Sequence, residues 1–367
     1  MSSTYDVAIC GAGPAGAVCA IAAARDGWNT ALLERVPFPR HKVCGDCLNP
    51  SVWPVLESLE VAGRIQALAS AALEQVRFVS RSGTIVEVPL PAGAERAVMR
   101  SLLDQALLEE AIQAGVTLIS GSPLTALHFD NGQWIATTAA AQLRAKVFIA
   151  ADGRNSTSCR LLGLSAPVRQ GRVALQCHAP LARAYQGTVA LELLPHGYCG
   201  VSPVDGEQMN ICMVSKTDRL ADTKATVHDR LHLPQDQPWR SLAPIDRGDL
   251  PPAPHPACFL AGDAARVVEP FTGEGIYYAL QSGKLAAAAA SRYLSGSDDS
   301  AAQYRTAHAG LYRNRLWINK LARLAVIHPQ LGDFLLGTGR HFPRLLEKLT
   351  AKVVTSPALP TARQKRF

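Results

Sequence analysis

The sequence predicts an α/β protein in which a parallel sheet is interrupted by a mainly antiparallel sheet and followed by C-terminal helices. Three observations predict this fold. Short apolar runs of the kind found in buried parallel strands occur at 5–10, 30–33, 145–151 and 257–261. Between these runs, residues 75–91 alternate in polarity, and residues 175–194 and 198–215 show no helical period. After residue 300 a helical period resumes.

Length and composition exclude several classes of protein. The 367 residues suffice for two or three domains, and 48% hydrophobic against 18% charged residues excludes disorder and coiled coils. No uncharged apolar run of about 18 residues occurs, so we expect no membrane-spanning helix. The start lacks the basic region of a secretion signal, and the nine cysteines suit a reducing compartment. We therefore expect a cytoplasmic protein with mostly buried thiols and no metal site.

The positive charge is concentrated at the C-terminal end. The net charge is +7, yet residues 301–367 hold 12 Lys and Arg against only Asp333 and Glu347, a balance of +10. The other 300 residues carry a balance of −3. This asymmetry favours an anionic neighbour, such as a phosphorylated or carrier-bound substrate, lipid head groups or an acidic protein; a solvated helical face explains it equally well. Nucleic acid is not expected, because no aromatic–basic interleaving is visible.

The first apolar run leads into Gly11-Ala-Gly-Pro-Ala-Gly16, which has the spacing of a dinucleotide-binding turn. Gly11 permits the tight turn, Gly13 lets the backbone approach a pyrophosphate, and Gly16 lets the helix expected at 15–26 pack on the strand. Glu34, 18 residues after Gly16, ends the second strand and is placed to accept hydrogen bonds from ribose hydroxyls. The alternative is a glycine-rich turn without a ligand, and the motif alone does not separate FAD from NAD.

Later segments carry a resemblance to a known family. The run at 145–151 ends in Asp152-Gly153, the run at 257–261 ends in Gly262-Asp263, and EPFTGEGI at 269–276 leads into a long alanine-rich helix. Together with the first turn, they resemble the FAD enzymes of the para-hydroxybenzoate hydroxylase fold, the group A flavin monooxygenase superfamily. Within it, PRHKVCGD and GDAARVVEPFTGEGIYYALQSGKLAA are most similar to the branch related to geranylgeranyl reductases.

The resemblance covers residues 1–300 and implies a domain organisation. A Rossmann-type FAD-binding domain would comprise 1–75, 97–160 and 255–300. Residues 76–96 and 161–254 would form an inserted substrate domain, and 301–367 a basic helical segment. FAD is the implied cofactor, with NAD(P)H as a transient reductant, because no second dinucleotide motif opens a βαβ unit.

The resemblance also implies which residues hold FAD. Asp263 would accept a hydrogen bond from a ribityl hydroxyl, and the amides of 270–275 would stabilise the flavin edge that becomes negative on reduction. Arg100 matches an arginine at the start of a helix near FAD, with an ordinary surface charge as the alternative, and Asp152 would lie near the diphosphate and the reductant. The full set of cofactor residues is Gly11, Gly13, Ala15, Gly16, Glu34, Arg35, Cys44, Arg100, Asp152, Gly153, Gly262, Asp263, Pro270, Gly273, Gly275 and Ile276.

Cys44 and Cys47 have the CxxC spacing of redox pairs. By resemblance, Cys44 is the single cysteine of the branch's Lys-x-Cys-Gly motif, near the substrate face of the flavin, as the catalytic proton donor or as a pocket wall. The alternative is a disulfide that exchanges electrons with the flavin, and Cys47, which departs from the branch's pattern, keeps it open. A third interpretation is that both are small residues in a tight loop. His41 and Lys42 would favour the thiolate if they lay close to it.

The middle of the chain is expected to form the substrate pocket. Residues 75–91 should form a hairpin turning at 82–83, and the strands within 175–215, with a turn at 205–206, should roof the flavin. The branch commonly has Trp and Phe where this chain has Cys199 or Gly200 and Ser202, which favours a smaller or more polar ligand than a long isoprenoid, or a ligand that enters elsewhere. The pocket residues implied by the resemblance are Tyr198, Gly200, Ser202, Pro203 and Phe271.

A polar linker at 295–300 precedes two expected helical stretches, at 303–326 and 342–354. The first is amphipathic, which usually means packing on its own domain and alternatively a membrane-surface role. Its expected apolar face is Leu311, Leu316, Ile318, Leu321, Leu324 and Ala325, and its expected basic face is Arg313, Arg315, Lys320 and Arg323.

Two chemistries and one non-enzymatic role remain open. Reduced flavin could pass a hydride to a C=C bond, or run the reverse dehydrogenation, on a small organic, carrier-linked or lipid-linked substrate. It could instead capture oxygen as a C4a-hydroperoxide for hydroxylation or epoxidation. The third hypothesis is a flavoprotein that binds or matures a partner protein through its basic end. We expect an FAD-dependent oxidoreductase, and the Cys44 segment favours the reductase chemistry.

Overall fold

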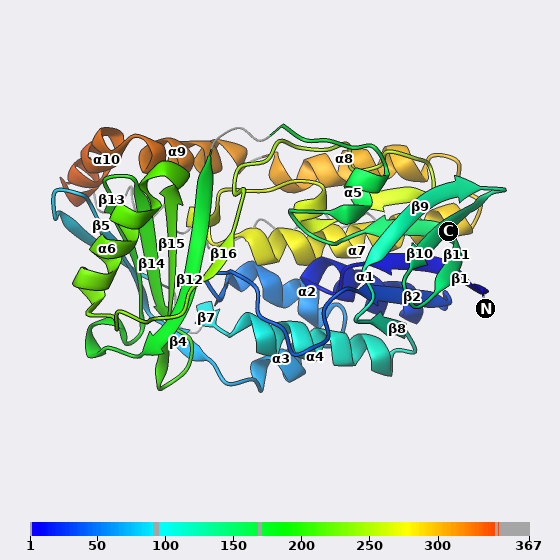
Figure 1. Ribbon diagram of the computed structural model, residues 1–367, viewed down its shortest axis with the longest axis horizontal. Helices are drawn as coiled ribbons and strands as arrows, with labels where there is room; N and C mark the ends of the chain where they lie inside the picture. The colour runs from blue at the N-terminus through cyan, green and yellow to red at the C-terminus, as the bar shows by residue number, and fades with distance from the viewer. Residues whose placement is uncertain (1, 91–94, 168–170, 314, 342–343, 345–367) are drawn as a thin grey trace.

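The computed structural model describes residues 2–90, 95–167, 171–313, 315–341 and 344. Two large sheets lie at opposite ends of the molecule, and the long helix α7 (Gly275–Leu294) crosses its middle (Figure 1). The predicted fold class, α/β with a parallel sheet, a mainly antiparallel second sheet and C-terminal helices, is confirmed.

The first sheet has seven strands, of which most pair in parallel. They are β1 (Ser2–Cys10), β2 (Thr30–Glu34), β8 (Thr117–Ser120), β9 (Leu124–Asp130), β10 (Gln133–Thr138), β11 (Gln142–Ala150) and β17 (Cys258–Leu260). The order is β8-β2-β1-β11-β10-β9, with β17 paired to β11. Because β1, β11 and β17 are parallel neighbours, the turns that follow them meet at one edge of the sheet.

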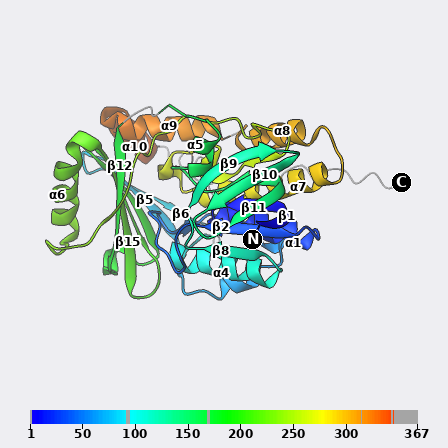
Figure 2. The same ribbon diagram turned by 45° about the vertical axis from the view of Figure 1, so that its right-hand side comes forward.

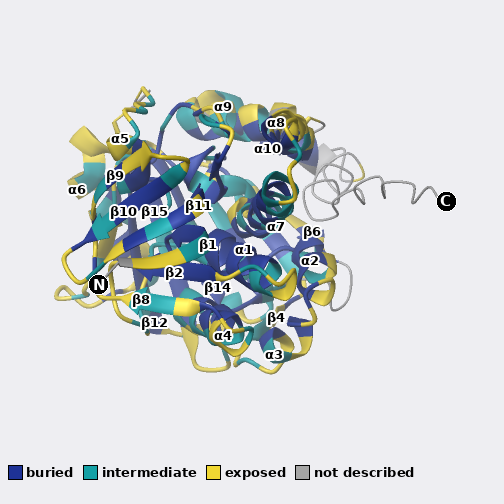
Figure 3. Ribbon diagram, turned by 90° about the vertical axis from the view of Figure 1, so that its right-hand side faces the viewer, coloured by how far each residue is buried: buried dark blue, intermediate teal, exposed yellow. Residues whose placement is uncertain are grey.

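Helices cover both faces of this sheet. The first face carries α1 (Pro14–Arg25), α2 (Trp53–Glu57), α3 (Ala62–Gln66), α4 (Arg100–Gln113) and α7, and α8 (Ser300–Tyr312) packs on α7; α5 (Thr157–Leu161) packs near β9. The alanine-rich α1 is almost wholly buried between the sheet, α4 and α7, and the central strands are equally dark in Figure 3. Small side chains allow this close packing.

Gly283→Ala is expected to destabilise the protein by about 1–3 kcal/mol. A Cβ at 283 would lie 2.2 Å from the carbonyl oxygen of Ala15, so α7 and α1 would have to separate. The control is Gly310→Ala in α8, where a Cβ would meet no atom within 4 Å and alanine should stabilise by up to about 1 kcal/mol. Urea unfolding of both variants measures the difference, and equal stabilities would contradict the close contact.

The second sheet is antiparallel except where β5 and β13 pair in parallel. Its strands are β5 (Gln75–Val79), β6 (Ile85–Pro89), β12 (Arg172–Pro180), β13 (Thr188–Leu194), β14 (Gly197–Pro203), β15 (Gln208–Lys216) and β16 (Arg240–Leu242), in the order β16-β12-β15-β14-β13-β5-β6. The hairpin expected at 75–91 is β5–β6. A small sheet of β3 (Cys47–Leu48), β7 (Glu95–Ala97) and β4 (Ala71–Leu73) lies at the chain crossings between the two large sheets.

Helices sandwich the second sheet as well. Helix α6 (Leu220–Leu231) packs through Val227 on one face (Figures 1 and 2). Helices α9 (Leu316–Ile327) and α10 (Pro329–His341) pack on the other face, where Val326 and Leu336 meet Tyr198 and Val214. Helix α6 was not predicted; its apolar face consists of only Leu220, Val227 and Leu231, and polar residues Thr223 and His228 are buried beside them.

The C-terminal helices differ from the expectation in three respects. The stretch expected at 303–326 contains two helices, α8, which ends at Tyr312, and α9, which begins at Leu316. Arg315, expected on an exposed basic face, is buried and paired with the equally buried Glu274. Leu324, expected on the buried apolar face, is 46% exposed. The ion pair is a tertiary contact, so the helical period could not reveal it.

Helix α10 was not predicted at all. Pro329 is usually a helix terminator, but here it stands in the first turn, where its missing N–H costs nothing. Gly332, Gly337 and Gly339 lower the helix propensity, yet Gly332 is required, because a Cβ there would lie 2.8 Å from the Ala325 carbonyl oxygen of α9. The second expected stretch, 342–354, lies outside the described residues except for Arg344.

His308→Gln is expected to make stability less sensitive to mild acid. His308 is buried between Tyr304 and Tyr312, and burial, assisted by Arg266, lowers its pKa from 6.5 to about 4. Below pH 6.5 the His308 imidazole is protonated in the unfolded chain but stays neutral in the folded chain. The free energy of unfolding therefore falls as the pH drops from 6.5 towards 4. Between about pH 7.5 and pH 5, the wild type should lose about 2 kcal/mol more than the variant in urea unfolding. Parallel pH profiles would contradict the buried neutral imidazole.

Candidate active site

A cavity of about 480 Å³ lies where the turns of the first sheet face the second sheet. One part of its wall is formed by the N-terminus of α1, at Gly13–Ala15, and by the turn after β11, at Gly153. Gly262 and Asp263 after β17, and the start of α7, complete this part. The other part is formed by strands of the second sheet and by α9 and α10. The predicted glycine-bearing turns therefore converge on one space.

The first turn has the geometry that its glycines predict. Gly11 has φ +102°, and a Cβ there would lie 2.5 Å from the Ala151 carbonyl oxygen. A Cβ on Gly16 would lie 1.8 Å from the Gly11 carbonyl oxygen, so these two glycines serve packing rather than ligand contact. At Gly13 a Cβ would meet only Arg40, at 3.7 Å, so this part of the turn is open to the cavity.

Glu34 is buried at the end of β2, where its Oε2 accepts the Ala12 N–H at 2.9 Å and lies 3.5 Å from Arg40 Nη2. Arg35, also assigned to the site, is exposed and does not line the cavity. Asp152 accepts hydrogen bonds from the Ser156 and Ser158 hydroxyls and so stabilises the turn before α5. Asp152 is not among the residues that line the cavity. Sequence reasoning missed Arg40.

The residues present fit a bound FAD. The helix N-termini of α1 and α7 both open into the cavity, and their partial positive charge favours a diphosphate and a reduced flavin edge, respectively. Gly153, Gly262 and Gly273 all have positive φ, which lets the backbone approach a ligand without a side chain. The buried Nε atoms of Arg40 and Arg154 meet no acceptor among the described residues, and a phosphate or hydroxyl oxygen would satisfy them.

Arg100 begins α4 and lines the cavity. Its Nε and Nη2 each donate to the buried Asp104 at 3.0 Å, and Arg40 pairs with the same carboxylate at 3.2 Å. Burial lowers the pKa of Arg100, but Asp104 raises it more, so it stays above its usual value. Lys42, not among the predicted site residues, also lines the cavity, and burial beside Arg100 lowers its pKa.

Cys44 and Cys47 both line the cavity and are both in the thiol form. Burial raises the pKa of the Cys44 thiol, and the Arg100 guanidinium offsets only part of this rise. Cys44 is therefore protonated at neutral pH. His41 and Lys42 would favour the thiolate only if they lay close to it, and the cation that acts on the Cys44 thiol is Arg100. A protonated thiol in the wall of the cavity can donate a proton but is a poor nucleophile.

Asp46, between the two cysteines, holds their loop against the second sheet. It is fully buried, adopts φ +58°, and its Oδ2 lies 3.0 Å from His178 Nε2 on β12. The Asn210 amide donates to the Cys44 carbonyl oxygen at 2.8 Å, and the Ser202 hydroxyl donates to the Gly45 carbonyl oxygen at 3.2 Å. Nothing in the local sequence indicated these contacts, because their partners lie more than 100 residues away.

The predicted pocket residues Tyr198, Gly200, Ser202 and Phe271 line the cavity, whereas Pro203, at the end of β14, does not. The wall beyond the flavin turns is strongly apolar, contrary to the polar or small ligand that Gly200 and Ser202 favoured. Its apolar residues come from β5, β12, β13, β14, β15, β16, α9 and α10 and include Val76, Phe78, Ala174, Val189, Leu191, Leu193, Val214, Leu242, Ile318, Leu321, Ala325, Leu335 and Leu336.

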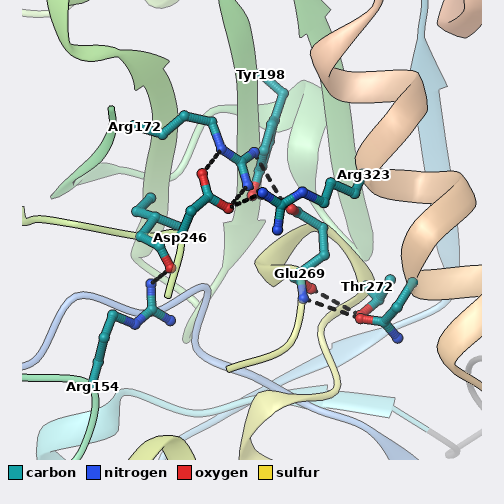
Figure 4. Close-up of polar contacts among 9 residues, drawn as sticks. Arg154, Arg172, Tyr198, Asp246, Glu269, Thr272 and Arg323 are labelled. Atoms are coloured by element: carbon teal, nitrogen blue, oxygen red, sulfur yellow. Dashed lines mark hydrogen bonds and ion pairs between the residues drawn. The ribbon is translucent and has the colours of Figure 1, made fainter. Parts of the chain in front are cut away.

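A buried ion cluster braces the loop that precedes the flavin turn (Figure 4). Arg172 on β12 donates to Asp246 at 2.6 and 2.7 Å and to Glu269 at 2.7 Å, and all three are nearly inaccessible. Arg323 on α9 pairs with Asp246 at 2.9 Å, and the Tyr198 hydroxyl donates to Glu269 at 3.3 Å. The cluster therefore fixes Glu269, which directly precedes Pro270.

A second contact from α9 fixes the other end of this loop. The Asn319 amide oxygen accepts the Glu269 N–H at 3.1 Å, and its nitrogen donates to Glu274 at 2.8 Å. Arg315 pairs with the same Glu274 carboxylate, which directly precedes α7. The segment 269–274, which carries the flavin-facing glycine, is thus held at both ends by one helix of the substrate wall.

Comparisons with known proteins agree with this site. The FAD binding domain model matches residues 4–306. The digeranylgeranylglycerophospholipid reductase of Methanoculleus marisnigri is 30% identical over 329 residues, covering 82% of this chain and 80% of that protein. The menaquinone reductase of Mycobacterium tuberculosis H37Rv is 30% identical over 319 residues, covering 78% and 76%.

Solved structures show the same fold. A geranylgeranyl bacteriochlorophyll reductase-like protein from Thermoplasma acidophilum has a TM-score of 0.72 at 22% identity, covering 97% of this chain and 93% of that chain. The flavin-dependent brominase Bmp2 has a TM-score of 0.76 at 19% identity, covering 96% and 94%.

The fold and site define an FAD-dependent oxidoreductase. The chain belongs to the FAD-binding family of the para-hydroxybenzoate hydroxylase fold, in the branch related to geranylgeranyl reductases. Among the described residues, no helix combines the length and apolarity needed to cross a membrane.

Proposed function

We propose that the protein reduces a C=C bond in a long apolar substrate, with FAD as the hydride carrier. The observation that supports this proposal is the shape of the cavity, which starts at the flavin turns and continues between the second sheet and α9–α10. Apolar side chains from eight elements line that continuation, and burial of an alkyl or isoprenoid chain against them is favourable by about 0.8 kcal/mol per methylene. The reductase relatives named above act on substrates of this chemical kind.

Different residues of this chain would carry out different steps of such a reduction. When bound, reduced FAD supplies a hydride, which adds to one carbon of the double bond. The Cys44 thiol is placed to give a proton to the other carbon, and its raised pKa keeps that proton available at neutral pH. The positively charged Arg100 guanidinium lies beside this thiol and helps to stabilise the thiolate that remains after proton transfer. The apolar wall excludes water and positions the double bond.

Anaerobic turnover tests the proposal against its alternatives. The purified holoenzyme is reduced with NADH, NADPH or dithionite without oxygen and mixed with geranylgeranyl lipids or menaquinone, while flavin absorbance is followed. Reoxidation of the flavin with formation of the saturated product supports the reductase. A flavin that stays reduced until oxygen is admitted, with oxygen then found in the product, would instead identify a monooxygenase. Turnover of neither kind, with a stable protein complex, would identify the partner-binding role.

A further inference from the structure

The hairpin of α9 and α10 carries large apolar side chains on its outer surface. Phe334 on α10 is 68% exposed, more than any other large apolar residue described, and Trp317 and Leu324 on α9 are each 46% exposed. Trp317, Lys320 and Leu324 are spaced by three and four residues, so they share one exposed stripe of α9. Trp317 and Leu324 therefore form an exposed apolar stripe on α9, and Phe334 is exposed on the helix that packs against α9. Large apolar side chains exposed in this way mark an interaction site.

The charge around this stripe is positive. Lys320 lies within it, and Arg313 and Arg344 are exposed near the two ends of the helix pair. Asp333 is the sole acidic residue in the described part of 301–344, and Arg81 of the β5–β6 turn neutralises it. Lys320, Arg313 and Arg344 form no ion pair with a carboxylate of the described residues. Apolar residues interleaved with such cations suit the head-group region of an anionic bilayer, where Trp is also enriched.

The inner side of the same hairpin is a wall of the cavity. Ile318, Leu321 and Ala325 of α9 and Leu335 and Leu336 of α10 face that space. The width of one helix therefore separates the exposed stripe from the apolar cavity. A lipid-dissolved substrate that reached the hairpin from outside would have only this short distance to travel to the flavin turns.

We propose that α9 and α10 form a docking surface for an anionic lipid bilayer, through Trp317, Lys320, Leu324 and Phe334, and that the substrate enters from the bilayer at this hairpin. The proposal rests on the proposed function for the nature of the substrate. A symmetric contact with a second copy would bring the Lys320 side chains of both copies into one interface, which like-charge repulsion opposes. An anionic membrane surface meets the same cations with opposite charge.

Vesicle flotation tests the docking surface without any assay of activity. Full-length holoprotein is mixed with phosphatidylcholine vesicles containing or lacking phosphatidylglycerol. We expect binding to the anionic vesicles that weakens in high salt. The double variant Trp317→Ser, Phe334→Ser should reduce the partition coefficient by more than about tenfold, and Lys320→Glu should reduce binding to anionic vesicles alone. The matched control is Ile112→Ser, which removes a 45% exposed side chain from α4 and should leave binding unchanged.

Two further measurements separate the outcomes. Retained FAD absorbance and an unchanged unfolding midpoint show that a variant is folded. With substrate dispersed in detergent the double variant should turn over like the wild type, whereas with vesicle-embedded substrate its rate should fall in parallel with binding. If the wild type did not bind anionic vesicles, or if the double variant bound them as well as the wild type, the proposed docking surface would be wrong, even if the substrate is reduced. Dissociation of a dimer by these substitutions would assign the face to a second copy and equally refute the proposal.

Discussion

Cys44→Ala is expected to slow substrate reduction by about 100-fold or more, because general acid catalysis typically contributes that much. The thiol lines the cavity together with the flavin turns, and burial raises its pKa, so it holds a proton that alanine cannot supply. Flavin reduction by NAD(P)H should change little, since that half-reaction needs no proton from Cys44. Stopped-flow absorbance measures the two half-reactions separately.

Cys47→Ser is the matched control for Cys44→Ala. Cys47 lines the same cavity three residues further along the loop. In the proton-donor mechanism its substitution should leave the rate of substrate reduction within a few fold. Equal loss of activity in both variants would point instead to the dithiol mechanism that the CxxC spacing also allows. If Cys44→Ala alone slowed the reduction of the flavin by NAD(P)H, the thiol would act in the binding or reaction of the reductant instead.

Arg172→Met is expected to destabilise the protein by about 3–5 kcal/mol, which is the usual effect of removing one member of a buried ion pair. Asp246 and Glu269 would remain buried with Arg323 as their nearest cation, on the Asp246 side alone. Because Glu269 precedes the flavin turn at Pro270, the variant should also release FAD more readily. Urea unfolding and flavin absorbance after gel filtration measure the two effects.

Arg77→Met is the control for the buried cluster. Arg77 pairs with Glu87 at 2.7 Å across the β5–β6 hairpin, but the two side chains are 25% and 45% exposed. Its removal should cost less than about 1 kcal/mol and leave FAD bound. If Arg172→Met unfolded at the same urea concentration as Arg77→Met, the cluster would have no special role in stability.

The parallel sheet and its three turns could be predicted because each depends on local sequence. Apolar runs mark β1, β11 and β17, and the glycines at 11, 153 and 262 mark conformations that other residues rarely adopt. Strand order then follows from the βαβ connection rules, which bring the three turns to one edge. The cofactor site is therefore encoded in short segments.

The substrate wall could not be predicted in the same way. Gly200 and Ser202 favoured a smaller or more polar ligand, but apolar residues from eight elements line the wall. One of these elements is α10, which was not predicted because its proline and glycines lower the helix propensity. Arg315 was placed on an exposed face because the helical period carries no information about Glu274, which is 41 residues away. The contacts of Asp46 with His178 are likewise tertiary.

The double contact of Asn319 with both ends of segment 269–274 bears on the design of chimeric enzymes. Exchange of the C-terminal helices among homologues is an obvious route to new substrate range. A foreign helix, however, would remove the countercharges that Arg323 and Arg315 provide to Asp246 and Glu274. It would also remove the hydrogen bonds of Asn319 to the Glu269 N–H and to the Glu274 carboxylate. The smallest interchangeable module is therefore the helix pair together with residues 269–274. A graft of the helices without residues 269–274 would change the substrate specificity but weaken the binding of FAD.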